Sequence, residues 1–127
     1  MTQEEKDLLL SDISARARYH VILHFDDKVQ QEDEYFYGMR ENGGKFLIND
    51  AYYIEEVKPY LRPMSSMTEE EKKEFENLLE GIIDGVERWD KPDMCEEYNF
   101  LNAHHFDYRG LIEKGLALEA LEGMYEF

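Results

Sequence analysis

Two prolines, Pro59 and Pro63, mark the point where the pattern of this 127-residue sequence changes from strand-like to helical. Proline disfavours a helical conformation in the residue before it, so residues 55–67 are expected to form an irregular connection. Residues 1–54 carry one helical pattern followed by short strand patterns, and residues 68–127 carry helical patterns. Because helices and strands are segregated along the chain, the sequence predicts an α+β fold in a single domain.

The first half is expected to form an N-terminal helix packed on a small antiparallel sheet, a meander. Thr2 and Glu5 have the spacing of a capping box, which predicts a helix over residues 2–17. Within Glu41-Asn42-Gly43-Gly44, the Asn-Gly pair is expected to supply the positive φ angles of a tight hairpin turn. Residues 30–34 are polar and predict a connection. The expected strands are residues 20–25, 35–40, 45–48 and, as a further partner, 51–54.

The second half is expected to form two or three helices. Thr68 and Glu71 make a second capping box, and apolar residues follow at helical spacing, which predicts a helix over residues 68–86. Another helical face runs over residues 93–105. Asp107 then stands where an N-cap belongs, ahead of a short third helix whose buried side would contain Leu111, Ile112 and Leu116.

The charge balance limits the partners that the chain can bind. Thirty acidic residues stand against 14 lysines and arginines, a formal net charge of −16. Such a surface repels phosphate groups, so neither direct nucleic-acid binding nor binding to a membrane is expected, and a partner chosen by charge is a basic protein. Cys95 is the only cysteine and no apolar run approaches the roughly 20 residues of a membrane span, which indicates a cytoplasmic protein.

The residues His104, His105 and Asp107 are the strongest candidates for chemistry, because imidazole and carboxylate groups bind zinc, iron or manganese. Adjacent histidines on a helix point about 100° apart, however, and a capping carboxylate is already engaged with backbone donors. We therefore expect a structural role, with His105 partly buried and His104 nearer solvent, and we expect neither a metal nor another cofactor. A small metal-dependent enzyme built on these three residues is the third hypothesis for function.

Two surfaces are candidates for binding a protein. Tyr35, Tyr37 and Tyr53 lie in the predicted sheet, where alternate side chains face solvent, and tyrosine is enriched at interfaces. A homodimer formed through this sheet is a variant of the same hypothesis. The alternative surface is the acidic stretch that contains Glu70, Glu74 and Asp84, whose carboxylates could imitate the phosphates of duplex DNA. An acidic DNA mimic that inhibits a DNA-binding host protein is accordingly the second hypothesis.

Two strings of this sequence resemble a known group of proteins. IEEVKPYLRPMSSMTEEEKKEF at residues 54–75 and FLNAHHFDYRGLIEKGLALEALEGMY at residues 100–125, behind TQEEKDLLL near the start, are similar to a family of small uncharacterised acidic proteins encoded in prophages and conjugative elements of gut bacteria. The resemblance covers a little under half of the chain and implies an accessory role in a mobile element. The expected function is therefore that of a non-enzymatic protein-binding accessory factor.

Overall fold

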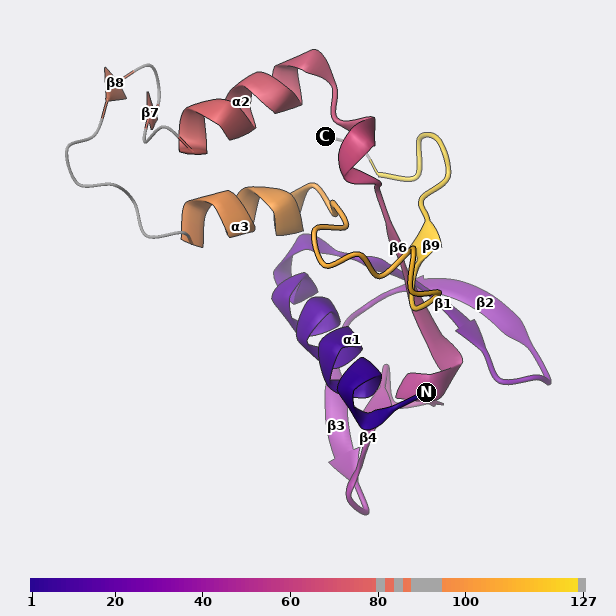
Figure 1. The fold of residues 1–127 in the computed structure, drawn as a ribbon. Helices are drawn as coiled ribbons and strands as arrows, with labels where there is room; N and C mark the ends of the chain where they lie inside the picture. Colours follow the sequence, from indigo (N-terminus) through magenta and orange to yellow (C-terminus); the bar gives the residue numbers. More distant parts are fainter. Residues whose placement is uncertain (80–81, 84–85, 88–94, 126–127) are drawn as a thin grey trace.

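The computed structural model describes residues 1–79, 82–83, 86–87 and 95–125 (Figure 1). It is an α+β structure with an N-terminal helix, as the sequence predicts. The helices are α1 (Gln3–Ala15), α2 (Glu69–Leu79) and α3 (Cys95–Ala103), with short 3-10 turns between elements. The strands are β1 (Ile22–Asp26), β2 (Gln31–Tyr35), β3 (Met39–Asn42), β4 (Lys45–Ile48), β5 (Tyr52–Tyr53), β6 (Val57–Leu61), β7 (Ile82–Ile83), β8 (Val86–Glu87) and β9 (Leu118–Glu119).

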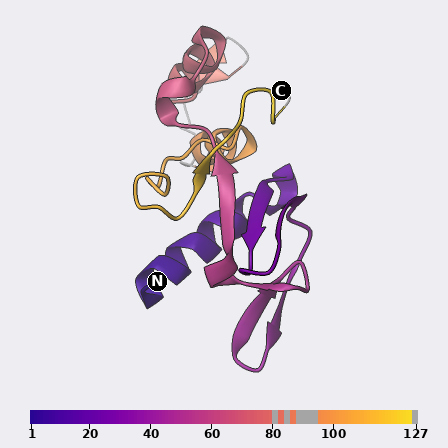
Figure 2. The same ribbon diagram turned by 90° about the vertical axis from the view of Figure 1, so that its right-hand side faces the viewer.

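The strands do not form the single antiparallel meander that the sequence predicts. One sheet has the strand order β2-β1-β6-β9, a second has the order β3-β4-β5, and β7 pairs with β8. The first sheet is mixed, because β6 runs antiparallel to β1 and parallel to β9. In Figures 1 and 2 the β3–β4 hairpin and the α2–α3 pair lie at opposite ends of the molecule.

The segment expected to be irregular contributes strand β6, so that prediction is wrong for Val57–Leu61. Pro59 pairs with Leu23 on β1, whereas the pairing with β9 begins only at Tyr60. A proline lacks a backbone donor and is tolerated in a strand where one side has no neighbour. The short reach of β9 therefore leaves room for Pro59 within the sheet.

The hairpin and the first helix follow the sequence more closely. Thr2 and Glu5 form the expected capping box at the start of α1. The strands β3 and β4 are joined by Gly43 and Gly44, which both have positive φ angles, so the turn lies one residue later than the predicted Asn-Gly pair and Asn42 ends β3. Such a pair matches the twist of the two strands in a two-residue turn.

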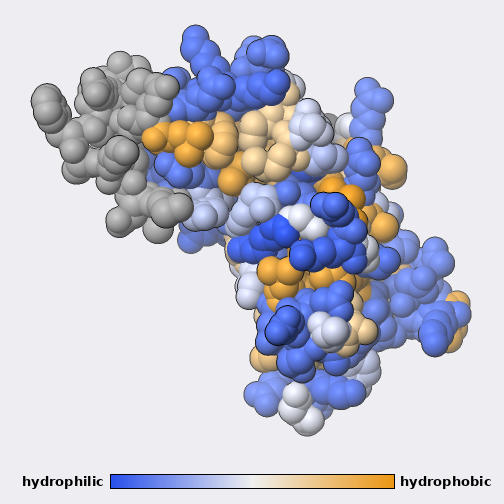
Figure 3. Space-filling model, in the orientation of Figure 1, coloured by the Kyte–Doolittle hydropathy of each residue, from blue (hydrophilic) through white to orange (hydrophobic). Residues whose placement is uncertain are grey.

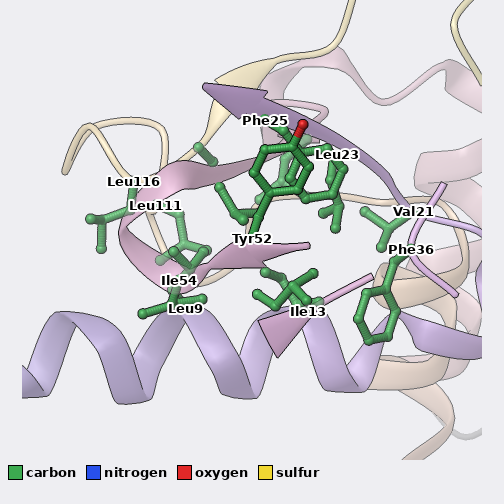
Figure 4. Packing of buried hydrophobic residues seen from close by; sticks show 14 residues of the cluster. Leu9, Ile13, Val21, Leu23, Phe25, Phe36, Tyr52, Ile54, Leu111 and Leu116 are labelled. Atoms are coloured by element: carbon green, nitrogen blue, oxygen red, sulfur yellow. The ribbon is translucent and has the colours of Figure 1, made fainter. Parts of the chain in front are cut away.

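The main core lies between α1 and the two sheets (Figure 4). Leu9 and Ile13 project from α1 toward strand side chains and are fully buried. The strand side contributes Val21, Leu23, Phe25, Phe36, Ile48, Tyr52, Ile54, Val57 and Leu61, and the C-terminal segment contributes Leu111, Leu116 and Ala117. A second, smaller cluster of Phe100, Leu101 and Phe106 packs with Met67, Phe75, Leu78 and Tyr108 between α2 and α3.

The helices of the second half are shorter than predicted. Helix α2 ends at Leu79 and residues 82–83 and 86–87 are strands, so the helix predicted over residues 68–86 is wrong beyond Leu79. The sequence carries Gly81 and Gly85 there, and glycine disfavours helix by about 1 kcal/mol against alanine.

The helix predicted after Asp107 is absent from the described residues 107–117, which form turns. The carboxylate of Asp107 accepts hydrogen bonds from the backbone N–H groups of Leu111, at 2.8 Å, and Ile112, at 3.0 Å. Gly110 and Gly115 have φ angles of 72° and 75°, which a right-handed helix does not contain. Asp107 therefore caps a compact turn instead of a helix.

Helix α1 is joined to the C-terminal half by a buried cluster of charges. Asp12 and Arg16 are both 0% exposed, and the guanidinium of Arg16 binds both carboxylate oxygens of Asp12, at 3.0 and 3.1 Å. Arg16 also donates to the backbone oxygen of Phe106 at 2.5 Å, and Arg109 donates to Asp12 at 2.6 Å. The cluster thus connects segments that are about 90 residues apart in the sequence.

We predict that Asp12→Asn lowers the free energy of unfolding by about 3–5 kcal/mol, because it leaves two arginines without their buried counter-charge. Asp50→Asn is the matched control, because Asp50 pairs with Arg40 on the exposed surface, where a salt bridge contributes at most about 1 kcal/mol. Urea denaturation of the three proteins measures both values. Equal effects of the two substitutions would contradict the structural role of the buried cluster.

Candidate functional site

The structure does not gather the three predicted metal-ligand candidates around one point. His104 Nδ1 lies 2.9 Å from Glu71 Oε2, and His105 Nε2 lies 2.9 Å from the backbone oxygen of Tyr19. Asp107 is engaged with the backbone of its own turn. In the part of the chain that the structure describes, no three histidine, cysteine or acidic side chains are arranged to hold a metal ion.

His104 belongs to a polar cluster that connects residues 54–75 with residues 100–125. Arg62 binds both oxygens of Glu71, at 2.7 and 2.8 Å, and the Glu71 carboxylate also accepts from the Thr68 backbone at 3.0 Å. The hydrogen bonds from Arg62 hold the pKa of Glu71 at about 2, far below its usual value. Glu71 is therefore ionised at neutral pH, with both oxygens occupied, and acts as a brace between α2 and the end of α3.

His105 ends helix α3 in a position usually taken by glycine. The φ angle of His105 is 58°. The backbone N–H of His105 donates to the backbone oxygen of Asn102, and the backbone N–H of Phe106 donates to the backbone oxygen of Leu101. These two bonds define a Schellman motif, in which the residue in the His105 position adopts the left-handed conformation. The sequence lacks the glycine that normally marks such an end, and the helix predicted over residues 93–105 therefore runs two residues too far.

The His105 ring is nearly fully buried and stacks on Tyr125, with 4.1 Å between the ring centroids. Burial, together with the nearby charge of Arg16, lowers the pKa of His105 to about 3. At neutral pH the ring is uncharged, and Nε2 donates to the Tyr19 carbonyl because that oxygen can only accept. His105 is thus a buried structural histidine at physiological pH.

Within the described residues, strand β2 is an acidic stretch whose residues are all exposed, whereas α2 contains the buried acid Glu71. Residues 26–34 contain five acids and one lysine, and all five residues of β2 are exposed. Strand β2 pairs with β1 on one side and is the edge of its sheet. Alternate backbone N–H and C=O groups of such a strand point away from the sheet and can pair with another chain.

The carboxylates of β2 are bound mainly by neutral or weakly basic groups. Glu32 accepts from the Tyr52 hydroxyl at 2.7 Å, and Asp33 accepts from the Tyr60 hydroxyl at 3.0 Å and lies 2.7 Å from His24 Nδ1. Burial and the hydrogen bond to Asp33 raise the pKa of Tyr60, so this hydroxyl stays protonated. No lysine or arginine among the described residues forms an ion pair with β2, and its negative charge is left to act on the surroundings.

The three predicted tyrosines do not share one sheet surface. Tyr35 ends β2 in the first sheet, and Tyr53 lies on β5 in the second sheet, where Lys45 sits over its ring at 5.4 Å. Tyr37 lies in the connection between β2 and β3 and donates from its hydroxyl to the backbone oxygen of Asn49 at 3.0 Å. All three are exposed, but they offer separate contact points.

The predicted acidic surface is only partly described. Glu70 and Glu74 are exposed on α2, whereas Asp84 lies outside the described residues. Helix α2 carries five acids against two lysines, and one of those acids, Glu71, is neutralised by Arg62. The uncompensated charge is consequently denser along residues 26–34 than along α2, and sequence reasoning missed this because it assigned residues 30–34 to a connection.

Comparisons of this chain with protein-family models, with curated proteins and with solved structures found no match. None of the described helices combines the length and the apolar character needed to cross a membrane. The function is therefore inferred from the charge and geometry of the residues described above.

We predict that stability falls as the pH is lowered from 7.5 to 5, and that His105 causes much of this loss. The unfolded histidine takes up a proton near pH 6.5, while the folded one resists protonation down to about pH 3, so stability rises with pH between these values. The expected loss is about 1.4 kcal/mol per pH unit below 6.5.

His105→Asn is the matched variant, because asparagine tolerates the left-handed conformation and does not titrate. Urea denaturation at pH 7.5 and pH 5 should give a smaller pH-dependent loss for this variant than for the wild type. The window stops at pH 5 because Glu71, whose pKa is lowered from 4.5, contributes a further loss only below that value. An identical pH dependence in both proteins would show that His105 titrates normally.

Proposed function

We propose that this protein is a non-enzymatic accessory factor that binds a basic protein, and that the β2 edge is its contact surface. One observation carries the proposal: an uncovered edge strand that exposes three consecutive carboxylates, Glu32, Asp33 and Glu34. The resemblance to proteins of prophages and conjugative elements supports an accessory role in a mobile element. A reducing cytoplasm is the compartment that a single cysteine favours.

Strand addition explains how such an edge would bind. An extended segment of the partner pairs with the outward N–H and C=O groups of β2, and this main-chain pairing supplies affinity. Lysines or arginines at alternate positions of that segment meet the carboxylates of Glu32 and Glu34 on one face, or that of Asp33 on the other. The net charge of −16 also attracts a basic partner over distance and increases the association rate at low salt.

The internal polar groups support a binding role over a catalytic one. Asp12, Glu71, His105 and Asp107 all hold backbone or guanidinium groups inside the fold. A catalytic acid or base must instead reach a substrate, with a pKa near the working pH. Glu71 and His105 do not meet this condition. Their pKa values are lowered to about 2 and about 3, far from neutral pH.

The acidic edge also opposes pairing of two copies of this chain, because like charges would face each other across the edges. We predict that the wild type is a monomer in light-scattering chromatography at neutral pH, and that Glu32→Gln with Asp33→Asn and Glu34→Gln increases self-association. A wild-type dimer that persists in this triple variant would place the dimer contact elsewhere.

We predict that a peptide of alternating lysine and threonine binds the wild type at least about tenfold more tightly than it binds this triple variant. Isothermal titration at low salt measures the two affinities, and binding should weaken as salt screens the charges. A peptide with glutamate in place of lysine should not bind. A peptide with proline in place of two threonines should bind weakly, because proline removes main-chain donors.

The matched control is the variant Glu70→Gln, Glu74→Gln, Glu76→Gln, which removes three exposed carboxylates from α2 instead of β2. It should keep nearly the wild-type affinity for the lysine peptide. Equal losses in the two triple variants would mean that total charge, and not the β2 edge, attracts the peptide. The same pair of variants then tests a partner captured from the native host, which should be basic and should be lost only with the β2 variant.

A further inference from the structure

A hollow of about 570 Å³ lies where the end of α1, the end of β2, the end of α3 and the C-terminal segment meet. Its lining includes Arg18 and His20 beyond α1, Tyr35 from β2, His105 beyond α3, and Gly123 and Tyr125 from the C-terminal segment. The volume is within the range of about 300–1,000 Å³ that small-molecule sites occupy. The hollow is separate from the outward edge of β2, although Tyr35 borders both.

The charge of this hollow is opposite to that of the rest of the molecule. None of the described residues that line it is acidic, although the chain carries 30 acids. Four other hollows on the described surface each contain at least two carboxylates. Of the acids next to the lining in the sequence, Glu34 and Glu122 are not part of it, and Glu126 lies outside the described residues. The described part of the wall therefore presents no carboxylate to an entering anion.

Arg18 gives the hollow a positive charge that is available to a ligand. Among the described arginines, Arg16, Arg40, Arg62 and Arg109 all bind carboxylates. Arg18 is exposed, lies 6.0 Å from the centroid of the Tyr19 ring and forms no ion pair with a described carboxylate. A guanidinium is the group that matches a carboxylate or phosphate with paired hydrogen bonds.

On the face shown in Figure 3, hydrophilic residues predominate, as expected for a chain in which acids outnumber lysines and arginines by 30 to 14.

Aromatic rings form much of the remaining wall. His20 and Tyr35 meet edge to face with 6.1 Å between their centroids, and His105 and Tyr125 are stacked at 4.1 Å. His20 and His105 have φ angles of 56° and 58°, a conformation that few residues other than glycine adopt. Two such residues at one hollow are the kind of local strain that collects at functional sites.

We infer that this hollow binds a small aromatic anion, with Arg18 holding the acidic group and the exposed rings of His20 and Tyr35 packing against the aromatic ring. Aromatic side chains prefer to pack edge to face or offset against a further ring, and the lining offers rings from three segments. This site goes beyond the proposed protein contact on β2, and neither depends on the other.

The test uses 2-naphthoate as the aromatic anion and 2-naphthamide as its neutral counterpart of the same shape, with cyclohexanecarboxylate as the anion that lacks an aromatic ring. Binding is measured by titration followed through backbone amide resonances, which also locates the ligand. We expect 2-naphthoate to bind at least about tenfold more tightly than either other compound, and to shift the resonances of Gly123, Ala103 and Tyr19 most.

Arg18→Gln should remove the preference for 2-naphthoate over 2-naphthamide, while Arg40→Gln, the same change on another exposed arginine, should keep it. Both sites are exposed, so both variants should melt near the wild-type temperature, and that measurement confirms the fold. The β2 triple variant should bind 2-naphthoate like the wild type, which separates this site from the protein contact. Equal binding of the naphthoate and the naphthamide, unchanged preference in Arg18→Gln, shifts located elsewhere or no binding would each overturn the inference.

Discussion

The buried pair of Asp12 and Arg16 is the interaction on which the joining of the two halves depends. A helix leaves its last carbonyl groups without partners inside the helix, and α3 ends in the interior of the molecule. Arg16 reaches this end from α1 and donates to the carbonyl of Leu101 as well as that of Phe106. A guanidinium in that place needs a counter-charge, and Asp12, one helical turn earlier, supplies it.

A second arginine, Arg62, extends this joint from strand β6 to helix α2. Its backbone forms an isolated bridge with Phe106, its side chain lies over the Phe106 ring at 4.3 Å, and its guanidinium holds Glu71. Residues 54–75 and residues 100–125 therefore touch at this point. The polar residues Arg62, Glu71 and His104 at this contact hold the α2–α3 pair against the first sheet.

The sequence predicts those features of the fold that depend on neighbouring residues. Both capping boxes form, at Thr2 with Glu5 and at Thr68 with Glu71, because each needs only a spacing of three residues. Strand β2 was not predicted, because an edge strand with no buried side needs no apolar alternation. Strand β6 was not predicted because it contains Pro59. A strand accepts this proline only because β9 does not extend beside it, and the sequence does not show how far β9 extends.

At the candidate site, too, the sequence predicts contacts between neighbouring residues but not ion pairs between distant ones. The sequence predicts that His105 is partly buried with a hydrogen bond. In the structure the ring has its hydrogen bond and is almost fully buried, although His105 lies just beyond the end of α3. The sequence does not predict that Glu71 would be withdrawn from the acidic surface, because its partner Arg62 is brought near only by folding. The ion pair of Asp12 and Arg16 is visible in the sequence, because two opposite charges lie one turn apart on the apolar face of the predicted first helix.

The placement of the arginines links the stability of this protein to its surface charge. In the described part of the chain, Arg16, Arg62 and Arg109 pair with Asp12 and Glu71, so three of the 14 lysines and arginines of this chain bind acids within the fold. The arginines that brace the interior are thereby unavailable to neutralise β2. Self-repulsion of the remaining acids opposes compactness, and the buried cluster opposes that repulsion. The strongly acidic edge that the proposed partner would recognise can persist because the internal arginines hold the fold together beneath it.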